Sequence, residues 1–220
     1  LFNLVDKFQC PGIVISDLLL SEGRSSVDPA ELDFNVPIDR GAVIGLNGDS
    51  PPPNGDYKRY KITESGISPR AVPGTPGYAH VVATDEHDED GVLISDEFTN
   101  PNKRRAIHEK RMRKMEGILP LLEPPGIFGP ADTEVTLVGW GSTAGVIREA
   151  MEKLAGEEGI VANHLQIKWL VPLHADAIAS IVSNSKKTII VENNYSGQFA
   201  RYLRSETSIV AAGHIRKYDG

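Results

Sequence analysis

The residue types best suited to chemistry gather in one acidic turn, Thr84-Asp85-Glu86-His87-Asp88-Glu89-Asp90. Five carboxylates beside one imidazole could hold a divalent metal, because hard cations prefer oxygen ligands and histidine adds a nitrogen. However, consecutive residues seldom converge on one ion, and this spacing matches no metal-binding loop that we can name. The sequence therefore favours a solvated turn that ends at Gly91, and it predicts no metal site.

A second candidate is Arg70, in the segment Ser68-Pro69-Arg70-Ala71-Val72-Pro73-Gly74. The prolines on both sides restrict the backbone, so the guanidinium could be held ready to bind a carboxylate through two parallel hydrogen bonds. An arginine on an exposed loop explains the same residues equally well. The sequence leaves both interpretations open.

Two other polar segments follow predicted strands. Gly139-Trp140-Gly141-Ser142-Thr143-Ala144 opens a predicted helix, as a dinucleotide-binding fingerprint does, but Ile167-Lys168-Trp169-Leu170 stands where that fingerprint needs an acid. A tight turn without nucleotide is favoured, and the role of the Gly139–Gly141 turn is left open. Val191-Glu192-Asn193-Asn194-Tyr195-Ser196-Gly197-Gln198 could bind a ligand at a sheet edge or cap the next helix.

Composition excludes several classes of protein. The net charge of −7 makes nucleic acid a poor partner, and the basic residues Lys103-Arg104-Arg105 and Lys110-Arg111-Met112-Arg113-Lys114 are expected to pair with acids of the protein or of a partner subunit. Cys10 is the single cysteine, so any iron–sulfur cluster must be held by a partner. There is no apolar run of about 18 residues and no signal-peptide pattern, so we expect no membrane association and a cytoplasmic location.

The N-terminal part of the chain, residues 1–24, reads as the last unit of a larger α/β domain. A helix and a turn lead to a buried strand at Ile13-Val14-Ile15, and a helix from Asp17 closes at Gly23. The sequence begins without methionine inside this half-unit, which would need neighbouring strands to cover its edges. We therefore expect the N-terminus to be a truncation.

Residues 25–130 have a different character, because thirteen of the fifteen prolines fall there. Proline prevents long strand ladders, so we expect a Pro-rich connecting region that contacts a partner. Its strongest helix signal runs from Lys103 to Met115.

Residues 131–220 alternate regularly between strand and helix, which predicts a parallel sheet covered on both faces. The expected strands are Val135–Val138, Leu165–Leu170 and Thr188–Val191, and the expected helices are Ser142–Ala155, closed by Gly156, Ala175–Val182 and Gly197–Leu203. The first helix is expected to direct Val146, Ile147, Ala150, Met151 and Leu154 inward.

A series of these segments, in this order and at this spacing, resembles one family, the alpha subunit of 2-oxoglutarate (2-oxoacid):ferredoxin oxidoreductase. The segments are Ile15-Ser16-Asp17-Leu18-Leu19-Leu20-Ser21-Glu22, Arg59-Tyr60-Lys61-Ile62-Thr63, Ser68-Pro69-Arg70, Glu86-His87-Asp88-Glu89-Asp90-Gly91, Lys110-Arg111-Met112-Arg113-Lys114, Gly139-Trp140-Gly141-Ser142-Thr143 and Val191-Glu192-Asn193-Asn194-Tyr195-Ser196-Gly197-Gln198. The resemblance extends over essentially all 220 residues and identifies the chain as similar to a C-terminal fragment of such a subunit.

The resemblance implies a fold and an activity. Residues 131–220 would form an α/β, transketolase-C-terminal-like parallel sheet domain, preceded by the Pro-rich region and by the end of a pyrimidine-binding α/β domain at 1–24. The activity implied is oxidative decarboxylation of a 2-oxoacid, 2-oxoglutarate in the first place, to an acyl-CoA. Thiamine diphosphate and Mg would be bound mainly outside this chain, and an iron–sulfur cluster by the beta subunit. The partners implied are that beta subunit, ferredoxin, coenzyme A and the 2-oxoacid.

No catalytic residue is carried over from the family, because its Tyr-Pro-Ile-Thr-Pro segment and its substrate-carboxylate arginine do not occur in this sequence. The fragment alone is therefore expected to be inactive. Arg70, His87 and Asp88 are candidates for the substrate entrance, because they lie between the two expected domains. Arg70 or a protonated His87 could bind a distal carboxylate, whereas Asp88 would repel it or hold His87 in place. The alternatives are a stand-alone nucleotide-binding module or a structural α/β module.

Overall fold

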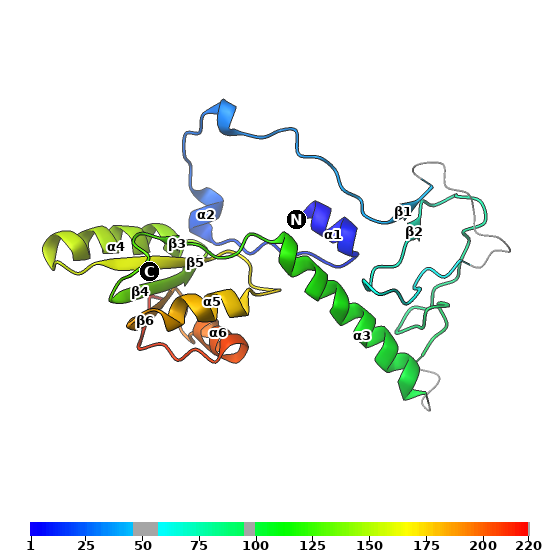
Figure 1. Ribbon diagram of the computed structural model, residues 1–220. Coiled ribbons are helices and arrows are strands. Elements are labelled where there is room, and N and C mark those ends of the chain that lie inside the picture. Colours follow the sequence, from blue (N-terminus) through cyan, green and yellow to red (C-terminus); the bar gives the residue numbers. More distant parts are fainter. Residues whose placement is uncertain (46–56, 95–99, 220) are drawn as a thin grey trace. The chain divides into compact units, whose positions relative to one another are not determined.

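The computed structural model describes residues 1–45, 57–94 and 100–219. The chain divides into two compact units, and each unit combines segments that are far apart in the sequence (Figure 1). Unit 1 consists of Leu1–Ile13 and Asp28–Leu121, and unit 2 consists of Val14–Val27 and Leu122–Gly220. Both units thus draw on the N-terminal segment, which the predicted boundaries after residues 24 and 130 did not anticipate. The assignment of residues 1–24 to a pyrimidine-binding domain stays a prediction.

Unit 2 is built around a five-stranded sheet. In space the strands lie in the order β3-β5-β4-β6-β7; β4 to β7 run parallel, and β3 runs antiparallel to β5. The predicted α/β sheet domain is confirmed, but the sheet is mixed, because the short connection 129–134 leaves no room for the crossover that a parallel β3 would need. The strands are β3 (Ile127–Phe128), β4 (Val135–Trp140), β5 (Ala162–Ile167), β6 (Lys187–Glu192) and β7 (Gly213–Arg216).

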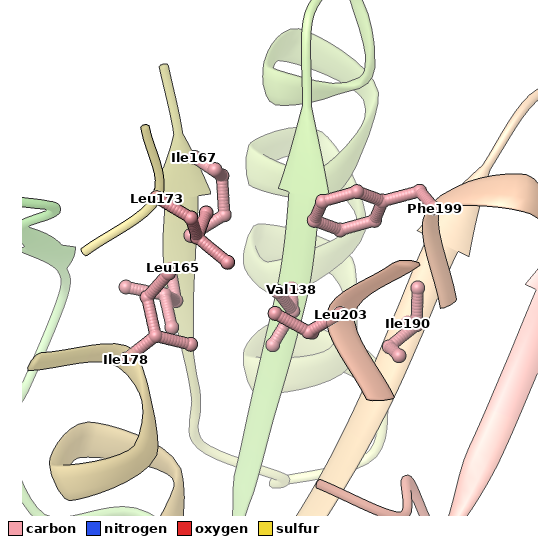
Figure 2. Packing of buried hydrophobic residues seen from close by; sticks show 8 residues of the cluster. All are labelled: Val138, Leu165, Ile167, Leu173, Ile178, Ile190, Phe199 and Leu203. Atoms are coloured by element: carbon pink, nitrogen blue, oxygen red, sulfur yellow. The ribbon is translucent and has the colours of Figure 1, made fainter. Parts of the chain in front are cut away.

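Helices cover both faces of this sheet: α4 (Thr143–Glu157) packs on one face, and α5 (Ala175–Ser183) and α6 (Gln198–Thr207) pack on the other. Successive side chains of a strand point to opposite faces, so Leu137 joins the α4 side and Val138 the other side. Figure 2 shows how strand and helix side chains meet in the larger cluster. Its buried members are Val138, Leu165, Ile167, Leu173, Ile178, Ile190, Phe199 and Leu203.

Two details of the predicted first helix of unit 2 are wrong. Val146 does not point inward and is 63% exposed, whereas Ile147 and Met151 are buried. Gly156 does not close α4, which runs on to Glu157.

The strand predicted at Leu165–Leu170 begins three residues earlier, where Ala162 pairs with Val135 of β4.

The N-terminal segment of unit 2 contains the short helix α2 (Leu18–Glu22). Asp17 begins α2 by accepting a hydrogen bond from the Leu20 N–H at 2.9 Å. The helix ends at Gly23 as predicted, but with φ −59° rather than in the left-handed region. The buried strand predicted at Ile13-Val14-Ile15 is wrong, since these residues are irregular and 59 to 84% exposed.

Unit 1 contains one long helix, α3 (Pro101–Ile118), in its described residues, and it is longer than the predicted Lys103–Met115. The Asn100 side chain caps α3, and Pro101 stands in the first turn, where a missing N–H costs nothing. The strands of unit 1 have two residues each, which fits the predicted effect of its prolines. The other elements in the described residues of unit 1 are α1 (Phe2–Phe8), η1 (Pro29–Glu31), β1 (Val43–Ile44), β2 (Arg70–Ala71) and η3 (Leu119–Leu121).

Across the described residues of both units, no helix combines the length and the apolar character needed to span a membrane.

Candidate functional site

The acidic turn lies against the basic face of α3 in unit 1. Glu86 is the centre of this contact: its carboxylate accepts from Arg104 at 3.0 Å, His108 at 2.8 Å and Arg111 at 3.2 Å. The three partners share one face of the helix, because they are spaced by four and three residues. The predicted pairing of basic residues with acids of the protein is therefore confirmed at this face.

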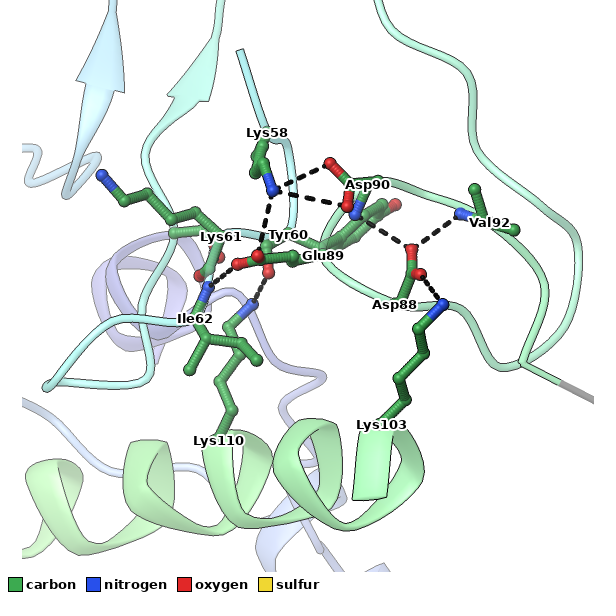
Figure 3. Close-up of polar contacts among 11 residues, drawn as sticks. Lys58, Tyr60, Lys61, Ile62, Asp88, Glu89, Asp90, Val92, Lys103 and Lys110 are labelled. Carbon is green, nitrogen blue, oxygen red and sulfur yellow. Dashed lines mark hydrogen bonds and ion pairs between the residues drawn. The ribbon is translucent and has the colours of Figure 1, made fainter. Parts of the chain in front are cut away.

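Glu89 and Asp90 pair with a different cation, Lys58 (Figure 3). The Lys58 Nζ lies 3.0 Å from each carboxylate, and Glu89 also accepts from the Ile62 N–H at 3.1 Å. Two contacts lower the pKa of Glu89: the hydrogen bond from the Ile62 N–H has the larger effect, and the hydrogen bond from Lys58 has the next largest. Glu89 and then Asp90 raise the pKa of Lys58 above its ordinary value.

Asp88 is only 7% exposed, and the turn itself uses its carboxylate. Oδ1 accepts from the N–H groups of Asp90 and Val92, each at 3.0 Å, and Oδ2 pairs with Lys103 at 3.1 Å (Figure 3). Burial raises the pKa of Asp88, but Lys103 and the two N–H groups outweigh this effect, so the pKa lies below its ordinary value. Gly91 completes the turn at φ +80°, where a Cβ atom would lie 2.2 Å from the Val81 carbonyl oxygen.

His87 lies on the same turn, with its ring centroid 3.9 Å from that of Tyr60. Its Nδ1 is 2.9 Å from the Asp85 carbonyl oxygen, which holds the ring against the turn. Glu86, Asp88 and Glu89 each pair with a cation, and within residues 1–45, 57–94 and 100–219 no three His, Cys, Asp or Glu side chains are grouped to hold a metal ion.

Arg70 lies on β2, and the carboxylate that it binds belongs to the same chain. Its Nη2 is 3.0 Å from Asp6 Oδ1 and also donates to the Arg40 carbonyl oxygen at 3.3 Å. Arg40 pairs with the other oxygen of Asp6 at 3.5 Å. The Arg70 Nε is buried and has no hydrogen-bond partner among the described residues. The structure therefore places Arg70, His87 and Asp88 in unit 1, where each of the three side chains contacts different residues.

Lys110 is a residue whose special environment the sequence did not indicate. It is 7% exposed, it lies on the buried face of α3 with Ile107 and Ile118, and its Nζ donates to the Tyr60 carbonyl oxygen at 2.9 Å. Burial, followed by the charges of Lys114 and neighbouring arginines, lowers the pKa of Lys110 to about 8. The available signal was the spacing, since Lys110 follows Ile107 by three residues and precedes Ile118 by eight, but a run of basic residues masks it.

Replacing Lys110 with methionine should remove part of the pH dependence of stability. The folded chain binds the Lys110 proton more weakly than the unfolded chain, so the free energy of unfolding rises as pH increases from about 8 to about 10.5. Between pH 7.5 and 9.5 we expect the wild type to gain roughly 2 kcal/mol relative to Lys110→Met. Urea unfolding followed by circular dichroism measures this difference, and equal pH dependence in both proteins would contradict it.

In unit 2, the glycine turn has a packing explanation. A Cβ atom on Gly139 would lie 2.4 Å from Ile147 Cδ1 and 2.7 Å from Thr143 Oγ1, so only glycine fits where α4 meets β4. Gly141 has φ +59°, in the left-handed region. The Ser142 hydroxyl donates to the carboxylate of Asp17, which holds the N-terminal segment of unit 2 on this turn. The hydrogen bond from the Ser142 hydroxyl has the largest effect on the pKa of Asp17 and lowers it, and the hydrogen bond from the Leu20 N–H lowers it further.

The polar segment after β6 caps α6, one of the two interpretations left open by the sequence. Glu192 is fully buried, and its two oxygens accept from the N–H groups of Phe199 at 3.0 Å and Ala200 at 3.2 Å. His214 Nε2 lies 2.6 Å from the same carboxylate, and Asn194 also donates to it. Asn194 Oδ1 accepts from the Gly197 N–H at 2.7 Å. These groups complete the N-terminus of α6.

Comparison with known proteins shows which proteins this chain is similar to. Residues 129–207 match the model of the transketolase C-terminal domain. The 2-oxoacid:ferredoxin oxidoreductase 2 alpha subunit of Aeropyrum pernix is 36% identical over 100% of this chain, and the corresponding subunit of Saccharolobus solfataricus is 34% identical over 99%. The chain covers 33% of each of these relatives.

A solved structure agrees with the sequence comparison. The 2-oxoglutarate:ferredoxin oxidoreductase from Magnetococcus marinus, with 2-oxoglutarate, coenzyme A and succinyl-CoA bound, has a TM-score of 0.77 and 32% identity. The match covers 97% of this chain and 36% of that chain. Over its whole length, this chain is homologous to 2-oxoacid:ferredoxin oxidoreductase alpha subunits.

The predicted resemblance to these alpha subunits is therefore confirmed, together with the transketolase C-terminal domain in unit 2. The chain spans about a third of the length of the relatives. Its residues do not fit the role of ligands to an iron–sulfur cluster, since Cys10 is its single cysteine and a cluster needs several thiolates.

Proposed function

We propose that this chain is part of the alpha subunit of a 2-oxoacid:ferredoxin oxidoreductase that acts on 2-oxoglutarate. The reaction converts 2-oxoglutarate and coenzyme A into succinyl-CoA and CO₂ and passes two electrons to two ferredoxin molecules. The observation that carries this proposal is the match over 97% of the chain to the Magnetococcus marinus enzyme with 2-oxoglutarate, coenzyme A and succinyl-CoA bound.

The proposal assigns the cofactors and partners to the assembled enzyme in the cytoplasm. Thiamine diphosphate and Mg would lie mainly outside this chain, and a beta subunit would hold the iron–sulfur cluster and pass electrons to ferredoxin. When bound, thiamine diphosphate supplies the carbanion chemistry, and the protein supplies orientation and electrostatics. The residues of this chain would contribute a rigid α/β unit and the charged surface of unit 1.

An activity assay tests the proposed function. The complete alpha and beta subunits should reduce ferredoxin or a viologen dye only when 2-oxoglutarate and coenzyme A are both present. The 220-residue chain alone should give no reduction above background, because it contains neither the cluster ligands nor the family's substrate-binding motifs. Reduction by the chain alone, or a complete enzyme inactive with every 2-oxoacid, would overturn the proposal.

We also propose that Arg70 and His87 influence which 2-oxoacid is accepted, while Asp88 holds the turn that carries His87. Support comes from the Arg70 guanidinium, which already binds a carboxylate, that of Asp6, and from a His87 ring held on the turn through its Nδ1. In the complete enzyme, Arg70→Ala and His87→Ala should each lower kcat/KM for 2-oxoglutarate relative to pyruvate by about 10- to 100-fold, the effect of losing one charge-assisted hydrogen bond.

Arg40→Ala is the matched control for Arg70, because Arg40 pairs with the same Asp6 but is more exposed. It should leave the preference within about twofold. If Arg40→Ala and Arg70→Ala change the preference equally, the effect passes through Asp6 and Arg70 has no recognition role. If His87→Ala keeps the preference of the wild type, His87 is excluded as well.

A further inference from the structure

Residues 32–38 of unit 1 alternate between large apolar and smaller or polar side chains. The apolar members are Leu32, Phe34, Val36 and Ile38, and they are 47%, 81%, 61% and 77% exposed. Successive side chains of an extended chain point to opposite sides, so this spacing puts all four on one side. Four large apolar side chains within seven residues are therefore open to solvent together, which is typical of an interaction surface.

Polar groups, not these apolar side chains, hold the end of the segment on unit 1. Asp39 pairs with Lys7 at 2.9 Å, and its N–H donates to Asn3 Oδ1 at 3.0 Å. The Asn3 side chain in turn donates to the Pro37 carbonyl oxygen at 2.8 Å. Asn3 and Lys7 lie on α1, so the contacts to this helix use the polar side of the segment. A surface strand ordinarily has the opposite arrangement, with its apolar side packed on the protein.

The backbone of the segment is open as well. Among the described residues, no hydrogen bond involves the N–H groups of Phe34, Val36 and Ile38. N–H groups two residues apart point to the same edge of an extended chain. An open edge combined with an open apolar side is the pattern of a strand that joins the sheet of a partner.

Charge decides which kind of partner fits. Residues 28–39 contain four acids and no Lys or Arg: Asp28, Glu31, Asp33 and Asp39. Two copies of the segment paired with each other would bring these carboxylates together, and like charges across a strand pair are unfavourable. The surface that fits the segment is therefore apolar with a border of Lys or Arg, and it is not a second copy of the segment.

The relatives indicate where such a surface lies. The chain covers 33% of the alpha subunits of Aeropyrum pernix and Saccharolobus solfataricus, so most of a subunit of that length lies outside these 220 residues. A surface on the same polypeptide meets the segment at a high effective concentration. We infer that residues 32–38 bind as an added strand to an apolar surface, bordered by Lys or Arg, in that other part of the alpha subunit. The inference rests on the proposed function, because it takes the chain to be part of such a subunit.

Amide hydrogen exchange tests this inference by comparing the 220-residue chain with the complete alpha and beta subunits. The Phe34, Val36 and Ile38 amides should exchange about tenfold more slowly or less in the complete enzyme, because ladder hydrogen bonds protect them. Equal rates in the two samples would overturn the inference. The measurement needs no substrate and no electron acceptor, so it can fail in an enzyme that reduces ferredoxin and succeed in one that does not.

Photocrosslinking locates the partner surface. A photoreactive benzoylphenylalanine at Phe34 of the complete enzyme should give adducts with the part of the alpha subunit outside the 220 residues. The same group at Val81, which is 82% exposed and also in unit 1, is the matched control. Adducts with the beta subunit or with a second copy of the alpha subunit, or no more adducts than at Val81, would refute the assignment.

Two variants test the apolar side itself. In the complete enzyme, Phe34→Ser and Ile38→Ser should each speed exchange of the remaining amides of residues 32–38 by about fivefold or more, whereas Val81→Ser should change it less than about twofold. In the 220-residue chain, Phe34→Ser should leave the urea midpoint unchanged, because its side chain is 81% exposed there. Wild-type protection in both Phe34→Ser and Ile38→Ser would mean that the apolar side binds nothing.

Discussion

Replacing Glu192 with alanine should lower the free energy of unfolding of unit 2 by about 3–5 kcal/mol. The Glu192 side chain is fully buried, and its carboxylate accepts from the Phe199 and Ala200 N–H groups and from His214. Alanine leaves these donors unsatisfied at the N-terminus of α6, and unmet buried donors cost the full desolvation of each group. The expected effect is large because several donors lose one acceptor together.

Tryptophan fluorescence in a urea titration is a direct measure of this effect, since Trp140 and Trp169 are the two tryptophans of the chain and both lie in unit 2. Glu192→Gln should be intermediate, because the amide oxygen can still accept from one side. The exposed Glu157→Ala is the control and should leave the urea midpoint unchanged. A Glu192→Ala midpoint equal to that of Glu157→Ala would show that the capping has no energetic importance.

Leu203→Ala should destabilise unit 2 by about 2–5 kcal/mol. Leu203 has no exposed surface and packs from α6 into the cluster that also contains Val138, Ile190 and Phe199 (Figure 2). Truncation removes buried methyl groups and leaves a cavity that close-packed neighbours cannot fill.

The matched control for Leu203 is Val146→Ala on α4, where the side chain is 63% exposed and the expected change is below about 0.5 kcal/mol. Both variants are compared with the wild type by the same fluorescence titration. A loss of less than about 1 kcal/mol in Leu203→Ala would mean that α6 is not part of the cooperative core.

The elements of unit 2 could largely be predicted from the sequence because their side chains repeat with the period of a helix or a strand. The segments leading to β4, β6, α5 and α6 have clear apolar patterns, and the structure places them within a few residues of the prediction. β3 and β7 were missed, because β3 has only two residues and β7 is mostly exposed. Neither strand has a pattern that a single sequence can reveal.

The error at Ile13-Val14-Ile15 has a related cause. A short apolar run reads as a buried strand, but burial depends on what covers it, and in this structure these residues are exposed. Composition alone therefore cannot decide between a buried strand and an exposed apolar surface.

The candidate residues were recognised by type, but their partners could not be derived. The sequence singled out Arg70, His87 and Asp88, whereas the contacts of Arg70 with Asp6 and of Asp88 with Lys103 depend on the tertiary fold. The same holds for Asp17 and Ser142, which are 125 residues apart. Long-range pairs of this kind carry no local pattern.

The distance along the chain between Asp17 and Ser142 has a consequence for synthesis. At about 5–20 residues per second, a ribosome needs roughly 6 to 25 s to pass from the first residue of this pair to the second. During that interval the segment Val14–Val27, with its apolar Leu18-Leu19-Leu20, has left the ribosome while the sheet of unit 2 has not yet been made. Newly made chains therefore spend this time with a Val14–Val27 segment that has no sheet to bind, and its Leu18-Leu19-Leu20 side chains stay 54 to 72% exposed in the folded chain as well.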